Sequence, residues 1–176
     1  MLRIRPLYLL LLAVALSLQA PLFAQREKFT PEDLVIVKSK WPEAKRTITG
    51  LRYVMLAEGT GDTARSGDMV SVVYRGSLIN GTVFNEYLDK TKPFSFRLGR
   101  GQVVDGWDQG LKLMREGSKM TLIVPYELGY GTRGNPPAVP RETSLVFEIE
   151  MVKIERGSQP PPPPPEIKKK PWYRFN

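Results

Sequence analysis

The side chains that could do chemistry in this chain are carboxylates, hydroxyls, amines and aromatic rings, because the sequence contains neither histidine nor cysteine. Thiol nucleophiles, disulfide bonds, imidazole metal ligands and histidine-based triads are therefore excluded. One pair of carboxylates, Asp105 and Asp108, flanks Trp107 and could serve acid-base chemistry. Capping of a helix that begins at Asp105 explains the same pair more simply. Any catalysis must then come from carboxylates, hydroxyls, amines, backbone groups, or the shape and dryness of a pocket, and we expect no metal and no cofactor.

Aromatic residues are the main candidates for such a pocket. Trp107 follows Gly106, and Tyr130 lies between Gly129 and Gly131. A buried tyrosine needs a partner for its hydroxyl, which makes Tyr130 a better candidate than a phenylalanine. The phenylalanines of the same region, taken one at a time, are explained equally well by packing in a core.

Short strands separated by glycine, proline, asparagine and aspartate are expected to position these rings. The segments with strand character are residues 51–58, 69–78, 82–84, 94–98, 118–124 and 144–154. Asn80-Gly81 predicts a type I′ turn, because both residues tolerate positive φ. In the last segment Leu145, Phe147 and Ile149 alternate with less apolar residues, which indicates one inward face.

A short helix is predicted around Trp107. Asp105 could cap its start, Trp107, Leu111 and Met114 share one face, and Gly117 could end it. Strands around a single short helix predict an α+β domain, in which an antiparallel sheet wraps around the helix and buries one face against it.

Two other segments are less regular. Residues 125–143 are rich in glycine and proline without a period, which is typical of a functional loop. Near the start of the chain, Thr30 could cap a helix with Pro31 at its first position, although Val35-Ile36-Val37 favours a strand.

Six motifs, in this order and at this spacing, resemble the FKBP family of peptidyl-prolyl cis-trans isomerases over about residues 48–155. They are Val72-Val73-Tyr74-Arg75-Gly76, Asn80-Gly81-Thr82-Val83-Phe84-Asn85, Lys92-Pro93-Phe94-Ser95-Phe96, Gly101-Gln102-Val103-Val104-Asp105-Gly106-Trp107-Asp108-Gln109-Gly110, Tyr126-Glu127-Leu128-Gly129-Tyr130-Gly131 and Leu145-Val146-Phe147-Glu148-Ile149-Glu150. The resemblance implies an FKBP-like fold.

The resemblance also implies a proline-binding pocket with Trp107 as its floor. Its walls would be Tyr74, Phe84, Phe94, Val103, Val104 and Phe147. The Tyr130 hydroxyl and the Val104 backbone amide would donate hydrogen bonds to the substrate, and Ala138 and Val139 would lie on a flap loop over the site.

Two positions depart from the family pattern. Asn85 stands where the family usually has an aspartate that orients neighbouring side chains, so the amide could lower activity. Asn135 stands where some members carry histidine, and that position varies within the family. We nevertheless count Asn85 among the catalytic residues, with Tyr130 and Val104.

Rotation about an X-Pro bond is chemistry that such a pocket can perform. Twisting the planar amide costs about 18–20 kcal/mol and reduces its charge separation, so a dry aromatic pocket favours the twisted form relative to the planar one. The expected substrates are proline-containing polypeptides, and the family also makes macrolides candidate ligands. The alternative is a binding module that holds proline-containing segments as a chaperone with little turnover.

Residues 1–24 have the layout of a signal peptide, with Arg3 and Arg5 before an apolar run and Ala24 at its end. The alternative is an uncleaved anchor, but Gln19 and Pro21 shorten the run below the length needed to span a bilayer. We therefore predict an exported protein, periplasmic or secreted, without a transmembrane span in its mature form. The extension at residues 25–47 is too short for a dimerising arm, so we expect a monomer.

The isomerase domain is assigned to residues 48–156 and a proline-rich basic tail to residues 157–176. Six prolines at 160–165 favour an extended rod, and the lysines at 168–170 are followed by aromatics. The tail could be solvated and disordered, or it could grip an anionic envelope polymer, a membrane surface or a partner, with the domain as a passive head. The net charge of +8 is spread over the chain with clusters at its ends, so no nucleic-acid groove is indicated.

Overall fold

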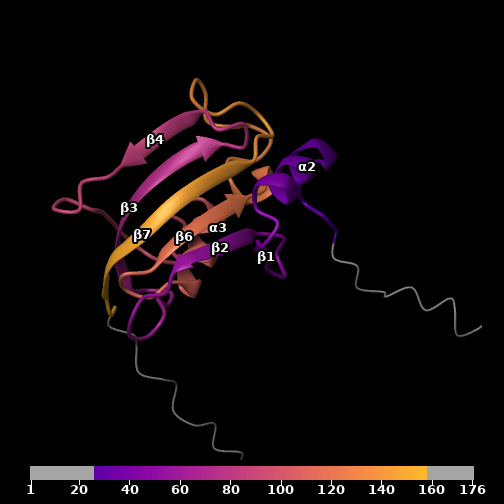
Figure 1. The fold of residues 1–176 in the computed structure, drawn as a ribbon. Helices are drawn as coiled ribbons and strands as arrows, with labels where there is room; N and C mark the ends of the chain where they lie inside the picture. Colours follow the sequence, from indigo (N-terminus) through magenta and orange to yellow (C-terminus); the bar gives the residue numbers. More distant parts are fainter. Residues whose placement is uncertain (1–25, 158–176) are drawn as a thin grey trace, which may run out of the picture.

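The computed structural model describes residues 26–157, so the predicted signal peptide and all but the first residue of the predicted tail lie outside the described residues. The elements are α2 (Pro31–Lys40), β1 (Lys45–Arg46), β2 (Arg52–Ala57), β3 (Met69–Leu78), β4 (Val83–Tyr87), β5 (Phe94–Arg97), α3 (Asp105–Gly110), η1 (Leu111–Leu113), β6 (Lys119–Val124), η2 (Tyr126–Leu128) and β7 (Leu145–Glu155). The α+β prediction is confirmed: a twisted antiparallel sheet curves around the short helix α3 (Figure 1).

The sheet has the strand order β1-β2-β6-β7-β3-β4, with β5 paired to β3 beside β4. β5 pairs with the first half of β3, from Met69 to Val72, and β4 pairs with the second half, from Tyr74 to Ser77. The edge of β3 is therefore shared by two short strands. This division allows β4 and β5 to carry side chains to two sides of the same space on the concave face.

Helix α3 lies against the concave face at very close range, and two glycines permit it. A Cβ atom at Gly106 would lie 2.6 Å from Val124 Cγ1, and one at Gly110 would lie 2.6 Å from Leu122 Cδ1. Real Cβ contacts are longer, so a larger residue at either position would require α3 or these β6 side chains to shift. Trp107, between these glycines in sequence, is held against the sheet and is buried.

The predicted strands match the observed ones to within a few residues, but the turn at Asn80-Gly81 is not type I′. Gly81 has φ 100°, whereas Asn80 does not have a positive φ. The Gly81 amide donates to the Leu78 carbonyl at 2.8 Å, and the Leu78 amide donates to the Thr82 carbonyl at 2.8 Å. This is a longer loop, a turn followed by one left-handed glycine, and it fits the register shift in the β3–β4 pairing.

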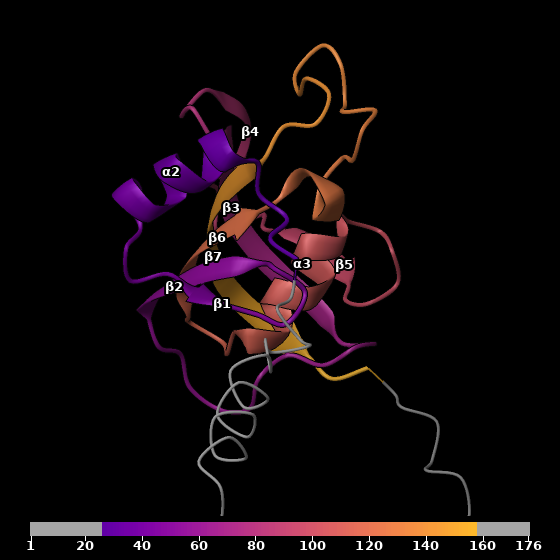
Figure 2. The same ribbon diagram turned by 90° about the vertical axis from the view of Figure 1, so that its right-hand side faces the viewer.

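The N-terminal segment packs on the opposite face of the sheet from α3, as Figure 2 shows. Its helix α2 has the predicted cap, because Thr30 Oγ1 accepts from the Asp33 amide at 3.1 Å with Pro31 at the first position. Val37 is fully buried in a second apolar cluster. That cluster joins Phe29 and Val37 to Ile79, Ile123 and Val146 of the sheet region. The sheet therefore buries one face along its length and the other at one end.

Electrostatic contacts also attach this segment to the sheet. Arg52 Nη2 of β2 lies 2.9 Å from Glu27 Oε2, and the Arg52 guanidinium lies 5.8 Å from the ring centre of Phe29. Burial alone would raise the pKa of Glu27, but hydrogen bonds from the Phe29 amide and from Arg52, with the charge of Arg52, hold the pKa below its ordinary value. Among residues 26–157, the helices are too short or too polar to cross a membrane.

Replacement of Val37 by alanine tests whether α2 is an integral part of the domain. The lost methyl groups leave space in the second cluster, so we expect the free energy of unfolding to fall by about 1–3 kcal/mol. The matched control is Val35→Ala on the exposed side of α2, where 69% of the residue is accessible and a change within about 0.5 kcal/mol is expected. Urea denaturation measures both, and equal effects of the two variants would show that α2 does not stabilise the sheet.

Candidate active site

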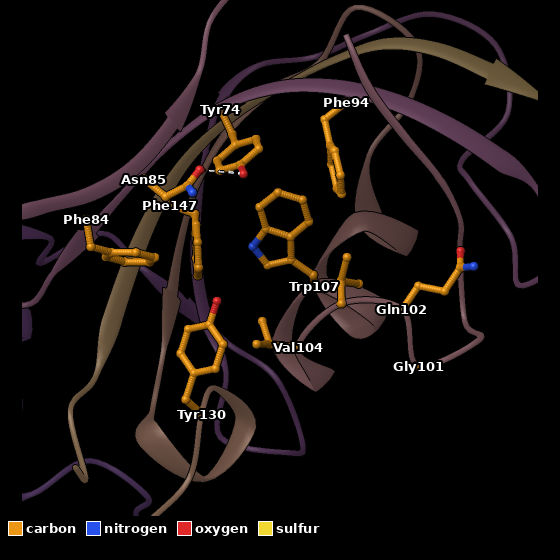
Figure 3. A pocket seen from close by; sticks show the side chains of 11 residues that line it. Tyr74, Phe84, Asn85, Phe94, Gly101, Gln102, Val104, Trp107, Tyr130 and Phe147 are labelled. Carbon is orange, nitrogen blue, oxygen red and sulfur yellow. Dashed lines mark hydrogen bonds between the residues drawn. The ribbon is translucent and has the colours of Figure 1, made fainter. Parts of the chain in front are cut away.

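A cavity of about 360 Å³ opens between the concave face of the sheet and the start of α3. Its lining is mostly aromatic and aliphatic, with a few polar groups, as is usual for a small-ligand site. The lining residues are Tyr74, Phe84, Asn85, Phe94, Gly101, Gln102, Val103, Val104, Trp107, Tyr130 and Phe147 (Figure 3).

Trp107 forms the base of the cavity, and its position follows from the close seat of α3 on the sheet. Its ring packs edge-on against Tyr74, with centroids 4.9 Å apart, and against Phe147, with centroids 5.2 Å apart. The indole nitrogen Nε1 is buried and has no hydrogen-bond partner among the described residues. Contacts of this geometry fix the ring in one orientation, so the indole presents a rigid apolar surface.

The two edge strands supply the side walls. Phe84 of β4 packs against Phe147 of β7 with centroids 5.8 Å apart, and Phe94 of β5 packs against Tyr74 of β3 at 6.0 Å. Gly76 of β3 makes room for the first pair, because a Cβ there would lie 2.9 Å from atoms of both phenyl rings. The aromatic wall therefore depends on a glycine in the central strand as well as on the rings themselves.

Polar groups enter the cavity from two directions. The Tyr74 hydroxyl donates to Asn85 Oδ1 at 2.7 Å, so the amide at this position accepts the hydrogen bond that a carboxylate would. Burial raises the pKa of Tyr74, and the nearby phenols of Tyr130 and Tyr87 raise it further. Figure 3 shows the Tyr130 hydroxyl pointing into the cavity toward Trp107. Tyr74 therefore stays protonated and anchored at neutral pH.

Val104 lies where the backbone turns into α3. It is the N-cap residue, and its carbonyl accepts the first hydrogen bonds of the helix from Trp107 and Asp108. The amide of an N-cap residue precedes the helical ladder and is not used by it. A donor on this residue is therefore available at the cavity edge, opposite the walls built by β4 and β5.

Nine of the eleven site residues predicted from sequence line this cavity. They are Tyr74, Phe84, Asn85, Phe94, Val103, Val104, Trp107, Tyr130 and Phe147. Ala138 and Val139 are not among the lining residues. Val139 is buried in the core, and its backbone pairs with Asn135 in both directions at 2.9 Å, whereas Ala138 is exposed on the loop.

Gly101 and Gln102 line the cavity but were not predicted. Both belong to the motif that contains Val103 and Val104, so contiguity was the signal that could have found them. Gln102 Oε1 accepts from the Arg97 amide at 2.8 Å, which ties this loop to β5. The loop is thus a structured wall of the cavity.

Asp108 holds the same loop, and this corrects the predicted capping role of the two aspartates. The helix is capped by Val104 without a side-chain hydrogen bond, and it is continued only by η1, which ends at Leu113. Asp108 Oδ1 accepts from the Gly99 amide at 2.7 Å and Oδ2 from the Gly101 amide at 3.0 Å. The carboxylate satisfies loop amides, which explains its position without acid-base catalysis.

Comparison with known proteins identifies the family of this chain. The family model described as "FKBP-type peptidyl-prolyl cis-trans isomerase" matches residues 61–152, about half of the chain. The chain belongs to this family. It is a peptidyl-prolyl cis-trans isomerase, as the sequence motifs predicted, and the family assignment agrees with the aromatic cavity described above. Within residues 26–157, no cluster of carboxylates suited to a metal ion accompanies the cavity.

Individual relatives share the domain. The chain is 52% identical over 96 residues to the peptidyl-prolyl cis-trans isomerase FKBP2 of Mus musculus, which covers 54% of this chain and 69% of that protein. It is 44% identical to an FK506-binding protein of Neisseria meningitidis, covering 56% of this chain and 91% of that protein. The crystal structure of FkpA from Escherichia coli matches with a TM-score of 0.62 and 35% identity, over 70% of this chain and 56% of that chain.

Removal of the Asp108 carboxylate should damage the isomerase without touching a cavity-lining side chain. In Asp108→Ala the Gly99 and Gly101 amides lose their acceptor, so the loop that carries Gln102 and Val103 loses its fixed shape. We expect kcat/KM to fall by about tenfold, which corresponds to about 1.4 kcal/mol. Peptide isomerisation kinetics provide the measurement. The control is Asp105→Ala, three residues away, and an equal loss in that variant would contradict the role given to Asp108.

The pH dependence of isomerisation should be flat between about pH 6 and about pH 9. The chain has no histidine or cysteine, and burial raises the pKa of Tyr74, so its neutral form persists to a higher pH than that of an ordinary phenol. Stopped-flow or NMR measurement of kcat/KM across this range checks the expectation. A bell-shaped profile would instead indicate general acid-base catalysis and contradict a mechanism based on the pocket alone.

Proposed function

We propose that this isomerase accelerates rotation about X-Pro bonds in exported polypeptides during their folding. The export part of this proposal rests on the pattern of residues 1–24, where two arginines precede an apolar run. X-Pro isomerisation takes tens to hundreds of seconds without a catalyst, so it can limit folding. The reaction needs no ATP, which suits a protein that works outside the cytoplasm.

The residues of the cavity have complementary roles in this proposal. The proline ring lies on the indole of Trp107 between the phenyl rings of Phe84 and Phe94. The Tyr130 hydroxyl and the Val104 amide donate to substrate carbonyls and hold the chain on either side of the rotating bond. Fixing both sides restricts motion to the useful rotation, and the apolar walls disfavour the dipolar planar amide relative to the twisted one. No covalent, acid-base or metal step is required.

Asn85 has a positioning role in this mechanism. Its Oδ1 accepts the Tyr74 hydroxyl at 2.7 Å, and the Tyr74 ring packs edge-on against Trp107. The uncharged side-chain amide of Asn85 thus keeps the Tyr74 ring in its edge-on contact with Trp107. For this reason we propose that the substitution of the usual aspartate by Asn85 leaves the isomerase active.

The observation that carries the proposal is the convergence of a rigid indole surface and a hydroxyl donor in one cavity of about 360 Å³. That volume suits a proline with part of its neighbours. Because the chain belongs to the FKBP family, we also propose macrolides as a second ligand class of the cavity. We retain the expectation of a monomer.

A chaperone role is the second candidate, and one surface feature favours it. Val83 and Tyr87 of β4 and the adjacent Leu88 are between 42% and 52% exposed, and β4 carries Phe84 into the cavity. An exposed apolar edge beside the pocket could hold unfolded segments without turnover. This candidate predicts suppression of aggregation that is independent of isomerisation.

Catalysed cis-to-trans exchange in a short X-Pro peptide, followed by NMR, tests the main proposal. We expect Tyr130→Phe to lower kcat/KM about two- to tenfold, because it removes one hydrogen bond worth about 0.5–1.5 kcal/mol. The matched control is Tyr126→Phe, a tyrosine of η2 that does not line the cavity. Suppression of aggregation by a folded chain that does not accelerate exchange would support the chaperone role instead.

A further inference from the structure

The chain leaves the domain at a fixed point, because Arg156 and Gly157 are held by the buried side chain of Asp68. Arg156 Nη1 lies 2.6 Å from Asp68 Oδ2, and the Gly157 amide donates to Asp68 Oδ1 at 3.2 Å. The Arg65 amide donates to the same carboxylate at 2.9 Å. Burial alone would raise the pKa of Asp68, but these hydrogen bonds and the charge of Arg156 hold it below its ordinary value. The carboxylate is therefore ionised, and the exit point fixed, at neutral pH.

The exit point is linked through Arg97 to the loop that walls the cavity. Glu155 and Arg97 lie on opposite sides of β3, yet Gly157 packs on Gly67, whose carbonyl accepts from Arg97 Nη1 at 2.9 Å. The chain therefore turns from β7 toward β5, on the side of the sheet that carries α3 (Figure 2). The Arg97 amide in turn donates to Gln102, a residue of the cavity wall, at 2.8 Å.

The sequence beyond Gly157 is long enough to return to the cavity. Two residues separate Gly157 from six consecutive prolines at 160–165. With about 3.3–3.6 Å per extended residue and about 3.1 Å per residue of a polyproline rod, the prolines can reach points from about 10 to about 26 Å away. The path along β5 from Arg97 to Phe94 in the cavity wall is about 10 Å. The cavity is thus within reach of the run.

We propose that the proline run 160–165 of the same chain binds in the proline pocket and competes with polypeptide substrates. This inference rests on the proposed role of the cavity as the proline site. The run presents pyrrolidine rings, the group that the indole of Trp107 and the phenyl walls would receive. Its internal amides carry no hydrogen, so its carbonyls are not engaged in local hydrogen bonds and can accept from the Tyr130 hydroxyl.

Tethering makes even a weak ligand effective. A short flexible connection gives an effective concentration in the millimolar range, so a proline segment with a dissociation constant of about 1 mM would fill about half of the pockets. The apparent KM for a substrate peptide would then rise about twofold, in proportion to the loss of free pocket. The value of kcat would not change, because a bound substrate has already displaced the run.

The test compares the full chain with a full-length variant in which the six prolines at 160–165 are replaced by serine. We expect the variant to have about half the KM for an X-Pro peptide and the same kcat. The signal of the Trp107 indole N–H should shift between the two proteins, and the shift should not depend on protein concentration. A control variant with Lys168, Lys169 and Lys170 changed to glutamine keeps the prolines and should behave like the wild type.

Three results would overturn the proposal. The first is an unchanged KM together with an unchanged Trp107 indole signal. The second is a difference that grows with protein concentration, which would mean that the run enters the pocket of a second copy. The third is an equal effect of the lysine variant, which would assign the competition to charge. If no protein in the series accelerates exchange, the proposed function fails, and the Trp107 signal alone still decides whether the run occupies the pocket.

Discussion

The close seat of α3 on β6 is the constraint on which the rest of the site depends. Gly106 and Gly110 bring the helix so near the sheet that added Cβ atoms would meet Val124 and Leu122 at 2.6 Å. That approach holds Trp107 in the concave face and forces Tyr74 and Phe147 to pack edge-on around it. A displacement of the helix would therefore move Trp107 away from the rings that pack against it.

The sheet contributes to the cavity through the edge of β3, which pairs with two different short strands. Because β4 and β5 each pair with one half of this strand, both can deliver a phenylalanine to the same cavity. Gly76 lies beneath one wall and makes space for the rings of Phe84 and Phe147. Small residues at these few positions thus allow large ones to assemble, which is the general condition for a dense aromatic cluster.

The polar groups of the site stabilise positions, and none of them is arranged for proton transfer. Asp108 satisfies the amides of the Gly99–Gly101 turn, and Asn85 anchors the Tyr74 hydroxyl. Asp68, the residue before β3, likewise holds Arg156 at the point where the chain leaves the domain. The same kind of contact therefore shapes the cavity loop and fixes the point at which the chain leaves β7.

The sequence by itself predicted the strand segments and the α+β class, because alternation and turn residues are local properties, and its resemblance to the FKBP family predicted most of the cavity residues. It also predicted a possible helix start at Thr30 and Pro31. Whether Val35-Ile36-Val37 would be helix or strand was left open by propensity. Only tertiary packing decided it, since Val37 buries against Ile123 and Val146 of the sheet.

Other features were beyond local reasoning for the same reason. The sequence predicts that Asp108 is a capping residue. Only the folded structure shows that it accepts hydrogen bonds from the loop amides of Gly99 and Gly101. Val139 lies on the predicted flap loop, but only the tertiary structure shows that its side chain is buried in the core. Partners that lie far apart in sequence are chosen by the free energy of the whole fold, so hydrogen bonds and burial across the chain are decided by the tertiary structure alone.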